Sequence, residues 1–378
     1  MDEPAMRPCV DTLAPMTVER MSRAKEAAAA AGLDAVLVTP GADLRYLTGY
    51  DAMPLERLTC LVLPASGEPV LVVPTLERPA AEASPAGAMG IDIVDWPDTD
   101  DPVALVANLV PTARRVAVDD HMWAEKVLRF QAAMPDAEQV LAGPVLHELR
   151  MRKAPAEVEA LRVAAAAIDR VHARMGEWLR AERTEREVGH DIADAIIAEG
   201  HQRVDFVIVA SGPSSASPHH SGSDRVIEVG DPVVVDIGGT MPSGYCSDEA
   251  RTYVIGVPPD EYVEAYGTLR RAQAAAVESA RPGVTAESVD AAARDVLTAA
   301  GLGDYFVHRT GHGIGLETHE DPYIVAGNTR MLEPGMAFSV EPGFYLPGRF
   351  GARIEDIVVT TGNGVERLNL RPRDLAIL

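Results

Sequence analysis

Four acidic residues interrupt apolar stretches that otherwise have the pattern of β-strands. Asp236 follows a run of valines in VVVDIGG, and Asp248 precedes the apolar part of SDEARTYVIG. Glu341 ends the apolar run of FSVEPG, and Glu355 lies between two isoleucines in RIEDIVV. A buried carboxylate destabilises a protein by several kcal/mol unless a cation or hydrogen bonds compensate it. The fold must therefore bring counter-charges to these strands.

The spacing of the four acids predicts two neighbouring pairs. Asp236 and Asp248 are separated by the Gly- and Pro-containing turn GGTMPSGY, and Glu341 and Glu355 by the loop PGFYLPGRFG. Such connections join antiparallel strands. Side chains on a strand alternate between its two faces, so each pair can point to a common side.

Metal ions are the counter-charge that this pattern favours. Arg251 and Arg353 are the nearest bases, and two guanidinium groups are too few for four carboxylates. Two divalent ions would balance the four acids charge for charge. With the imidazole of His312 the set is rich in hard oxygen ligands, which favours Mn, Co, Fe or Zn over a thiolate-type site. The competing interpretation is that each acid caps a turn or pairs with an arginine on an exposed face.

The stretch TGHGIGLETHE carries two histidines among glycines. It is unlike a phosphate-binding loop, because acids follow the glycines and Pro322 stops a helix there. It is unlike a zinc helix, because His312 and His319 are seven residues apart rather than four. We expect a tight backbone passage that presents His312 to a metal and His319 to a substrate, since glycine permits close approach.

The remaining histidines carry weaker signals. His219 and His220 lie in the Ser- and Gly-rich loop SASPHHSGSDR, and His308 precedes the glycine-rich stretch. Each of them, seen alone, has the features of an exposed loop residue. Three others lie in or near predicted helices without acids around them, and we interpret them as structural: His172, His190 and His201.

The chain is long enough for two domains at 378 residues. Up to about residue 150, predicted strands and helices alternate, beginning with a helix over 17–32 that Thr17 would cap, which indicates an α/β domain. From Pro155 on, paired helices and turn-linked strands predict an α+β domain around a mostly antiparallel sheet. We therefore expect domains at 1–150 and 151–378.

Charge and cysteine content exclude several classes. The formal net charge is −23, which argues against binding to nucleic acid or to an anionic membrane surface. No apolar run approaches the roughly 18–20 residues that span a bilayer, and the N-terminus lacks the features of a signal peptide. We expect a cytoplasmic protein. Cys9, Cys60 and Cys246 form neither a disulfide framework nor a zinc site, so free thiols are expected.

Six motifs occur in an order that resembles the pita-bread-fold metallopeptidases: PHHSGSDR, VVVDIGG, SDEARTYVIG, TGHGIGLETHE, SVEPG and RIEDIVV. That family includes methionine aminopeptidase, aminopeptidase P, prolidase and creatinase. The resemblance covers about 155–370. The preceding α/β domain resembles the creatinase-type N-terminal domain, which methionine aminopeptidases lack. The resemblance therefore implies the Xaa-Pro peptidase branch and a pita-bread catalytic domain.

The resemblance also implies roles for individual residues. The implied metal ligands, for two divalent ions with Mn first and Co, Zn or Fe also acceptable, are Asp236, Asp248, His312, Glu341 and Glu355. The implied catalytic residues are His219, His319 and Glu341, and the implied substrate-binding residues are His308 and Arg353. One departure concerns Asp248, which follows Asp236 by twelve residues where the family pattern has eleven.

The expected function is hydrolysis of the bond between an N-terminal residue and proline, by an Xaa-Pro aminopeptidase or an Xaa-Pro dipeptidase. The family implies a homodimer. Two other functions stay open: a metal-free, creatinase-like amidinohydrolase, and a non-catalytic peptide-binding module on the same fold. Two bound transition ions per chain favour the peptidase, whereas none would favour the other two.

Overall fold

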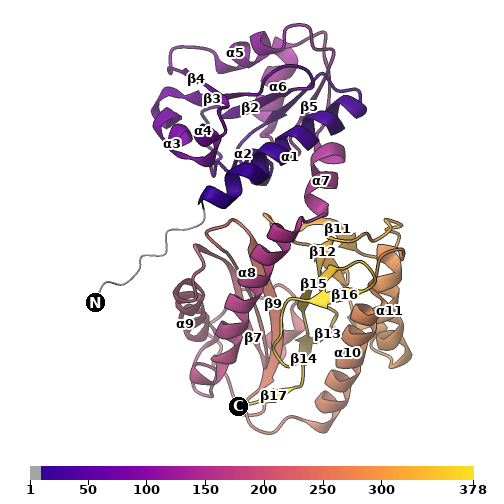
Figure 1. The fold of residues 1–378 in the computed structure, drawn as a ribbon. Coiled ribbons are helices and arrows are strands. Elements are labelled where there is room, and N and C mark those ends of the chain that lie inside the picture. The colour runs from indigo at the N-terminus through magenta and orange to yellow at the C-terminus, as the bar shows by residue number, and fades with distance from the viewer. Residues whose placement is uncertain (1–9) are drawn as a thin grey trace. The chain divides into compact units, whose positions relative to one another are not determined.

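The structure is a computed structural model that describes residues 10–378. The chain divides into two compact units whose boundary falls between Arg150 and Met151 (Figure 1). We refer to them as the N-terminal unit and the C-terminal unit and describe each by itself.

The N-terminal unit is built on a six-stranded sheet in the order β4-β3-β2-β1-β5-β6. Its strands β1 to β3 pair antiparallel and the other neighbours pair parallel. The strands are β1 (Ala35–Val38), β2 (Cys60–Pro64), β3 (Val70–Pro74), β4 (Asp92–Trp96), β5 (Arg115–Val118) and β6 (Glu138–Leu141). The helices are α1 (Val10–Ala30), α2 (Ala42–Thr48), α3 (Arg78–Ala83), α4 (Pro85–Ala88), α5 (Pro102–Leu109), α6 (Ala124–Ala133) and α7 (Gly143–Met151).

The predicted α/β alternation is confirmed, with two differences at the helices. Helix α1 begins at Val10, so Thr17 lies inside the helix, where it is buried and does not cap it. The prediction of a cap at Thr17 was wrong because a suitable capping residue does not stop a helix when the preceding residues can continue it. The helices α3, α4 and α7 were not predicted, and α3 and α4 have too few residues to show a hydrophobic period.

The C-terminal unit contains two sheets and a hairpin. One sheet has the order β17-β9-β8-β7, and the other has the order β11-β10-β12-β15-β16. The strands are β7 (Arg203–Ser211), β8 (Pro232–Thr240), β9 (Cys246–Val254), β10 (Gly311–Gly313), β11 (Glu320–Ile324), β12 (Ala337–Val340), β13 (Gly343–Leu346), β14 (Phe350–Arg353), β15 (Asp356–Thr360), β16 (Val365–Arg367) and β17 (Ala376–Ile377). All strand pairs are antiparallel except β9 with β17, which agrees with the predicted α+β class.

Two helix pairs cover the outside of these sheets (Figure 1). They are α8 (Pro155–Ala173) with α9 (Glu185–Ala198), and α10 (Asp260–Ser279) with α11 (Ala286–Ala299). The first pair packs on β7 to β9 through a core that includes Ile168, Ile192 and Val235. The second packs on the other sheet through residues such as Tyr262 and Phe338. The strands of the C-terminal unit therefore lie between the two helix pairs.

Two predicted strands are broken at their acidic residues. The stretch around Glu341 separates β12 from β13, and the stretch around Glu355 separates β14 from β15. Each acid donates its backbone N–H to a distant segment: Glu341 to the carbonyl of Thr310, just before β10, at 2.8 Å, and Glu355 to that of Ala250 in β9 at 3.0 Å. Pro342 has no N–H to continue the ladder. The prediction that both acids lie inside strands was wrong, and both lie where the chain passes from one strand pairing to the next.

Two other sequence predictions concern membranes and thiols. Among the described residues, none of the helices combines the length and apolar composition that a bilayer crossing requires. Cys60 and Cys246 are free and buried, as predicted, and Cys9 lies outside the described residues.

Candidate metal centre

The β8–β9 hairpin places the first pair of acids. Its register is continuous, with Asp236 opposite Ala250 and Gly238 opposite Asp248. Positions opposite one another, or two apart on one strand, share a face of the sheet. The carboxylates of Asp236 and Asp248 therefore point to the same side, as the sequence predicted. The twelve-residue spacing is accommodated by the turn without a bulge.

The end of the β12–β15 ladder places the second pair. Val340 lies opposite Asp356 in this ladder, so Glu341 and Glu355 follow directly beyond its last rung. Because the Glu355 N–H bonds the carbonyl of Ala250, this corner is fastened to β9 beside Asp248. The two predicted pairs thus meet at one place.

Strand β10 brings His312 between its neighbours β11 and β12. A Cβ added at Gly311 would lie 1.8 Å from the carbonyl oxygen of Ser339, and one at Gly313 would lie 2.1 Å from that of Asp321. Only glycine fits at these two positions, which explains the glycines on both sides of the histidine. The predicted tight backbone passage is therefore present.

Hydrogen bonding aims the His312 ring. Its Nδ1 lies 3.1 Å from the carbonyl oxygen of Gly313, and since a carbonyl only accepts, Nδ1 carries the proton. The Nε2 atom faces the acids, 3.3 Å from Glu341 Oε1 and 3.6 Å from Asp248 Oδ2. A histidine oriented through one nitrogen with the other turned toward carboxylates has the arrangement of a metal ligand.

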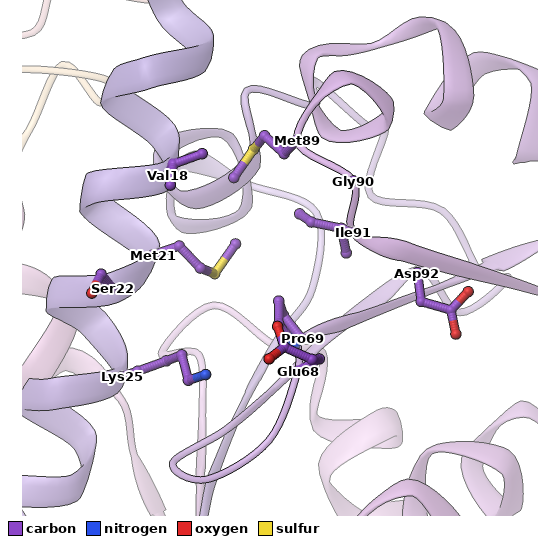
Figure 2. A pocket seen from close by; sticks show the side chains of 10 residues that line it. All are labelled: Val18, Met21, Ser22, Lys25, Glu68, Pro69, Met89, Gly90, Ile91 and Asp92. Atoms are coloured by element: carbon purple, nitrogen blue, oxygen red, sulfur yellow. The ribbon is translucent and has the colours of Figure 1, made fainter.

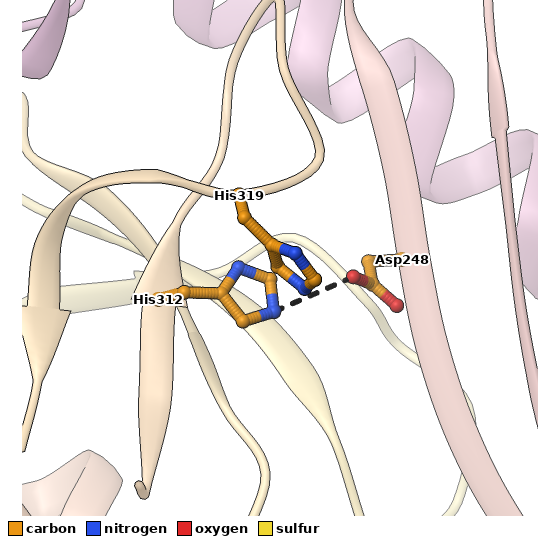
Figure 3. A group of neighbouring side chains, drawn as sticks. All are labelled: Asp248, His312 and His319. Carbon is orange, nitrogen blue, oxygen red and sulfur yellow. Dashed lines mark ion pairs between the residues drawn. The ribbon is translucent and has the colours of Figure 1, made fainter. Parts of the chain in front are cut away.

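All five predicted ligands converge in three overlapping groups whose ligand atoms lie within 4.8 Å of one another. The groups are Asp236–Asp248–Glu355, His312–Glu341–Glu355, and Asp248–His312–His319. Figure 3 shows the last group: the two imidazoles lie side by side and Asp248 faces them from β9. The ring centroids of His312 and His319 are 4.0 Å apart with nearly perpendicular planes.

The carboxylates strongly perturb one another. Burial, and next the charge of the neighbouring carboxylate, raise the pKa values of Asp248 and Glu355 well above the ordinary range. Burial also raises the pKa of Asp236. For Glu341, burial alone would raise the pKa, but the hydrogen bond and charge of His312, together with the charges of His308 and Arg353, lower the pKa to about 2.

Two buried oxygens of this cluster lack a hydrogen-bond partner among the described residues: Asp236 Oδ1 and Glu355 Oε1. Buried polar atoms in folded proteins are almost always satisfied. Unsatisfied oxygens among carboxylates that repel one another are the feature expected of a cation-binding site. The donor set, mostly oxygen with one imidazole, fits divalent ions of the Mn, Co, Fe and Zn type.

Arginines satisfy only part of the site. Arg353 donates from Nη1 to Asp236 Oδ2 and has Nε 4.0 Å from Glu341 Oε2. Arg251 contacts no ligand carboxylate; its Nη2 pairs with Glu249 at 3.0 Å and with Asp356 at 2.7 Å on the other face of the strands. The competing interpretation, pairing with arginine, therefore holds for one oxygen of Asp236 and not for the set.

A directed hydrogen-bond chain runs beside the acids. Arg353 Nε donates to the hydroxyl of Tyr345 at 2.8 Å, the hydroxyl contacts His308 Nε2 at 2.9 Å, and His308 Nδ1 reaches the carbonyl of Arg309 at 2.7 Å. Burial lowers the pKa of His308. Tyr345, which lies in β13, was missed in the sequence, although its position four residues after Glu341 was a usable signal.

His319 and His219, which the sequence predicts to contact the substrate, differ in how they relate to the cluster: His319 belongs to one of the three groups, and His219 does not. Burial, followed by the charge of His312, lowers the pKa of His319 to about 4. His219 is exposed and makes no hydrogen bond within the described residues. After burial and larger electrostatic effects, its charge adds to the lowering of the pKa of both His308 and His319, so it belongs to the same group.

The N-terminal unit offers a different kind of surface. Figure 2 shows a hollow between α1 and the residues that precede β3 and β4. It is lined by apolar side chains and by Lys25, Glu68 and Asp92, with Lys25 donating to the carbonyl of Gly67. Within residues 10–150, as far as they are described, no cluster of metal-ligating side chains occurs.

Comparisons with known proteins cover both units. Residues 159–362 match the profile of metallopeptidase family M24, and residues 20–152 match the creatinase/prolidase N-terminal domain. A probable dipeptidase PepE of Mycobacterium tuberculosis is 55% identical over 360 residues, 95% of this chain and 96% of the relative. An Xaa-Pro dipeptidase of Lactobacillus helveticus is 37% identical over 346 residues, 89% of this chain and 92% of the relative. The crystal structure of dipeptidase PepE from Mycobacterium ulcerans superimposes with a TM-score of 0.92 at 55% identity, over 96% of this chain and 98% of the other. The predicted fold class, a creatinase-type domain followed by a pita-bread domain, is confirmed by these matches.

Proposed function

Because the chain belongs to metallopeptidase family M24 and carries a creatinase/prolidase N-terminal domain, we propose that it is an Xaa-Pro dipeptidase that uses two divalent metal ions. The observation that carries the proposal is the convergence of five ligand-type side chains with two unsatisfied buried oxygens among them. The names of the similar proteins, dipeptidase and Xaa-Pro dipeptidase, support the choice of substrate.

The overlap of the groups suggests how the ions would be shared. Asp236 would hold one ion, His312 and Glu341 the other, and Asp248 and Glu355 would contact both. Manganese is the first candidate, with cobalt, zinc or iron as substitutes, because most of the donors are oxygens. Bound ions would act as Lewis acids that polarise the scissile carbonyl and activate water.

The remaining chemistry belongs to the side chains. Glu341 is a carboxylate within the cluster, and it accepts a proton from the attacking water at a carboxylate oxygen. His319, whose pKa is lowered to about 4, is neutral and donates an N–H to the carbonyl oxygen as its negative charge grows. His219 supplies a second donor from the loop that follows β7. His308 and Arg353 orient the substrate through Tyr345.

A dipeptide differs from a longer peptide in having its carboxylate one residue after the scissile bond. A cation near His319 would therefore select dipeptides. Arg309 fits: it is half-buried, its guanidinium stacks 4.4 Å from the ring centre of Tyr323, and no carboxylate of residues 10–378 forms an ion pair with it. Burial and the charge of His312 are the larger causes that lower the pKa of His319, and the charge of Arg309 adds to them.

The test is metal analysis followed by a substrate-length series. Protein loaded with Mn is assayed on an Xaa-Pro dipeptide, the same dipeptide as its C-terminal amide, and an Xaa-Pro-Yaa tripeptide. We expect about two ions per chain and a preference for the free dipeptide. Cleavage of none of the three by metal-loaded protein would refute the peptidase proposal, and preference for the tripeptide would identify an aminopeptidase instead.

Arg309→Gln tests the selection of the carboxylate. Losing a hydrogen bond to a charged group costs about 1.5–3 kcal/mol, so KM for the free dipeptide should rise roughly ten- to hundredfold while cleavage of the amide stays unchanged. Arg180→Gln, at an exposed arginine, is the matched control. An equal loss of activity on the free dipeptide and on its C-terminal amide would show that Arg309 does not bind the substrate carboxylate.

Two further functions are separated by the same metal analysis. A metal-free amidinohydrolase or a peptide-binding module would bind no transition metal, and the presence of all five ligand side chains in one cluster favours neither. We also propose domain limits of 1–150 and 151–378, a homodimer, and a cytoplasmic location. Light scattering and cell fractionation test the last two.

A further inference from the structure

A second buried carboxylate, outside the metal cluster, organises the loop that carries His219. Glu185 is the first residue of α9 and is fully buried. Its two oxygens accept five hydrogen bonds. Oε1 accepts from the backbone N–H and the hydroxyl of Ser211, both at 2.8 Å. Oε2 accepts from His220 Nε2 at 2.6 Å and from the hydroxyl and N–H of Ser223 at 2.6 and 3.2 Å.

These bonds fasten both ends of one chain segment to a single side chain. Ser211 ends β7 and Ser223 lies twelve residues later, so the segment between them, with the 3-10 helix η3 (Gly212–Ala216) and His219, forms a loop closed on Glu185. Arg225 reinforces the closure, since its Nη1 donates to the Ser211 hydroxyl at 2.6 Å and pairs with Asp231 at 2.5 Å.

The loop is also held from the side of the metal cluster. The carbonyl of Pro218 accepts a hydrogen bond from Arg353 Nη2 at 2.8 Å, and the hydroxyl of Ser215 accepts one from the Gly351 N–H at 2.8 Å. His219 therefore lies between two fixed neighbours: Pro218, bound to Arg353, and His220, bound to Glu185. Its own imidazole makes no hydrogen bond within the described residues, so these neighbours decide where it points.

We propose that Glu185 and His220 are positioning residues that aim His219 at the substrate carbonyl. The inference rests on the proposed peptidase function for its kinetic consequence, but not for its structural one. A side chain that must meet developing charge within a few tenths of an ångström needs a rigid support, and displacement by about 1 Å can cost up to a hundredfold in rate. His220 supplies the support through a short bond to a carboxylate that the core keeps in place.

The kinetic test uses His220→Leu and His220→Gln, with His190→Leu as control. His190 is exposed on the same helix α9. We expect His220→Leu to lower kcat on an Xaa-Pro dipeptide roughly tenfold or more with little change in bound metal. His220→Gln should recover most of the loss, because its amide N–H can donate to Glu185. The control should leave kcat unchanged.

A double variant separates positioning from general damage. If His220 acts through His219, then His220→Leu added to His219→Ala should lower kcat less than about twofold further, within the scatter of independent sites. A further tenfold loss in that background would overturn the proposal.

Hydrogen exchange gives a readout that needs no substrate. Amides of residues 213–223 should exchange faster in His220→Leu than in the unaltered protein, while those of 186–198 stay protected. Unchanged exchange in 213–223 would overturn the proposal even if the protein proves to cleave Xaa-Pro dipeptides. Faster exchange without any dipeptidase activity would leave the loop anchor in place and reject only the peptidase function.

Discussion

Replacing Glu355 by glutamine should change the stability of the protein in opposite directions with and without metal. Without metal the variant should be more stable than the unaltered protein, and with metal it should be less stable. Glu355 is 1% exposed, its Oε1 has no hydrogen-bond partner among the described residues, and its ligating oxygen lies within 4.8 Å of those of Asp236 and Asp248. Coulomb's law with an effective dielectric constant of about 20 gives at least about 3.5 kcal/mol of repulsion for two ionised carboxylates at 4.8 Å.

Protonation relieves part of this repulsion, because burial and the charge of Asp248 raise the pKa of Glu355. The measurable gain is therefore smaller, about 1–3 kcal/mol, and greater at pH 8 than at pH 5. A raised folded-state pKa gives stability that is complete below the unfolded pKa, near 4, and is lost as pH rises through the folded value. The unaltered, metal-free protein thus loses stability toward pH 8, and the amide removes one cause of that loss.

The assay is thermal unfolding of chelator-treated protein with and without Mn. Each kcal/mol shifts Tm by about 2–4 °C in a domain of 150–250 residues. A saturating ion at a hundred times its Kd adds about 2.7 kcal/mol to the unaltered protein, and the variant should lose most of that gain. Glu264→Gln, at an exposed site on α10, should change Tm little under either condition. A Glu355→Gln variant that is less stable without metal would refute the reasoning, since Glu355 would then be satisfied by the protein itself.

Three further outcomes follow from the same geometry. Metal affinity should rise with pH, because burial and neighbouring charge raise the pKa values of Asp248 and Glu355, and their protons must leave when a metal ion binds. Calorimetry in two buffers of different ionisation enthalpy measures the number of protons released. A result of no protons released would contradict the assignment of these two ligands. Tyr345→Phe removes the hydroxyl between Arg353 and His308, so that Arg353 Nε and His308 Nε2 both lose this hydrogen-bond partner. We expect kcat/KM to fall roughly tenfold at unchanged metal content, whereas a loss of metal would indicate a different role. Gly311→Ala places a Cβ 1.8 Å from a carbonyl and should destabilise by roughly 3 kcal/mol or more in denaturant unfolding, while Gly362→Ala, with open space around it, should be nearly neutral; equal effects would contradict the role of the strand passage.

The sequence predicted the parts of the centre that depend on local pattern. Asp236 and Asp248 could be paired because one short turn joins their strands and side chains alternate along each. The breaks at Glu341 and Glu355 were not predicted, because an apolar run looks continuous when its backbone bonds change partner, and the partners, Thr310 and Ala250, are distant in the chain.

The residues that hold the candidate site in place from outside it were not predicted either, because their partners are distant in the sequence. Glu185 and His220 are 35 residues apart, and Glu185 lies in none of the six motifs, so only the folded chain shows that they meet. Arg251 was considered as a partner for the four acids, yet it pairs with Glu249 and Asp356, each next to a proposed ligand in the sequence. Alternation sends those neighbours to the opposite face, which a count of charges along the chain does not reveal.

That opposite face has a consequence for how the enzyme responds to metal shortage. Arg251 donates to the backbone carbonyls of Ala250 and Glu355 and to the carboxylate of Asp356, and so ties β9 to β15 behind the ligands. Strand β9 and the segment of Glu355 and Asp356 are joined by this arginine, and by the hydrogen bond from the Glu355 N–H to Ala250, whether or not ions are present. Depletion of metal should therefore switch the enzyme off without unfolding it, and resupply should restore activity at the rate of ion binding, with no refolding delay.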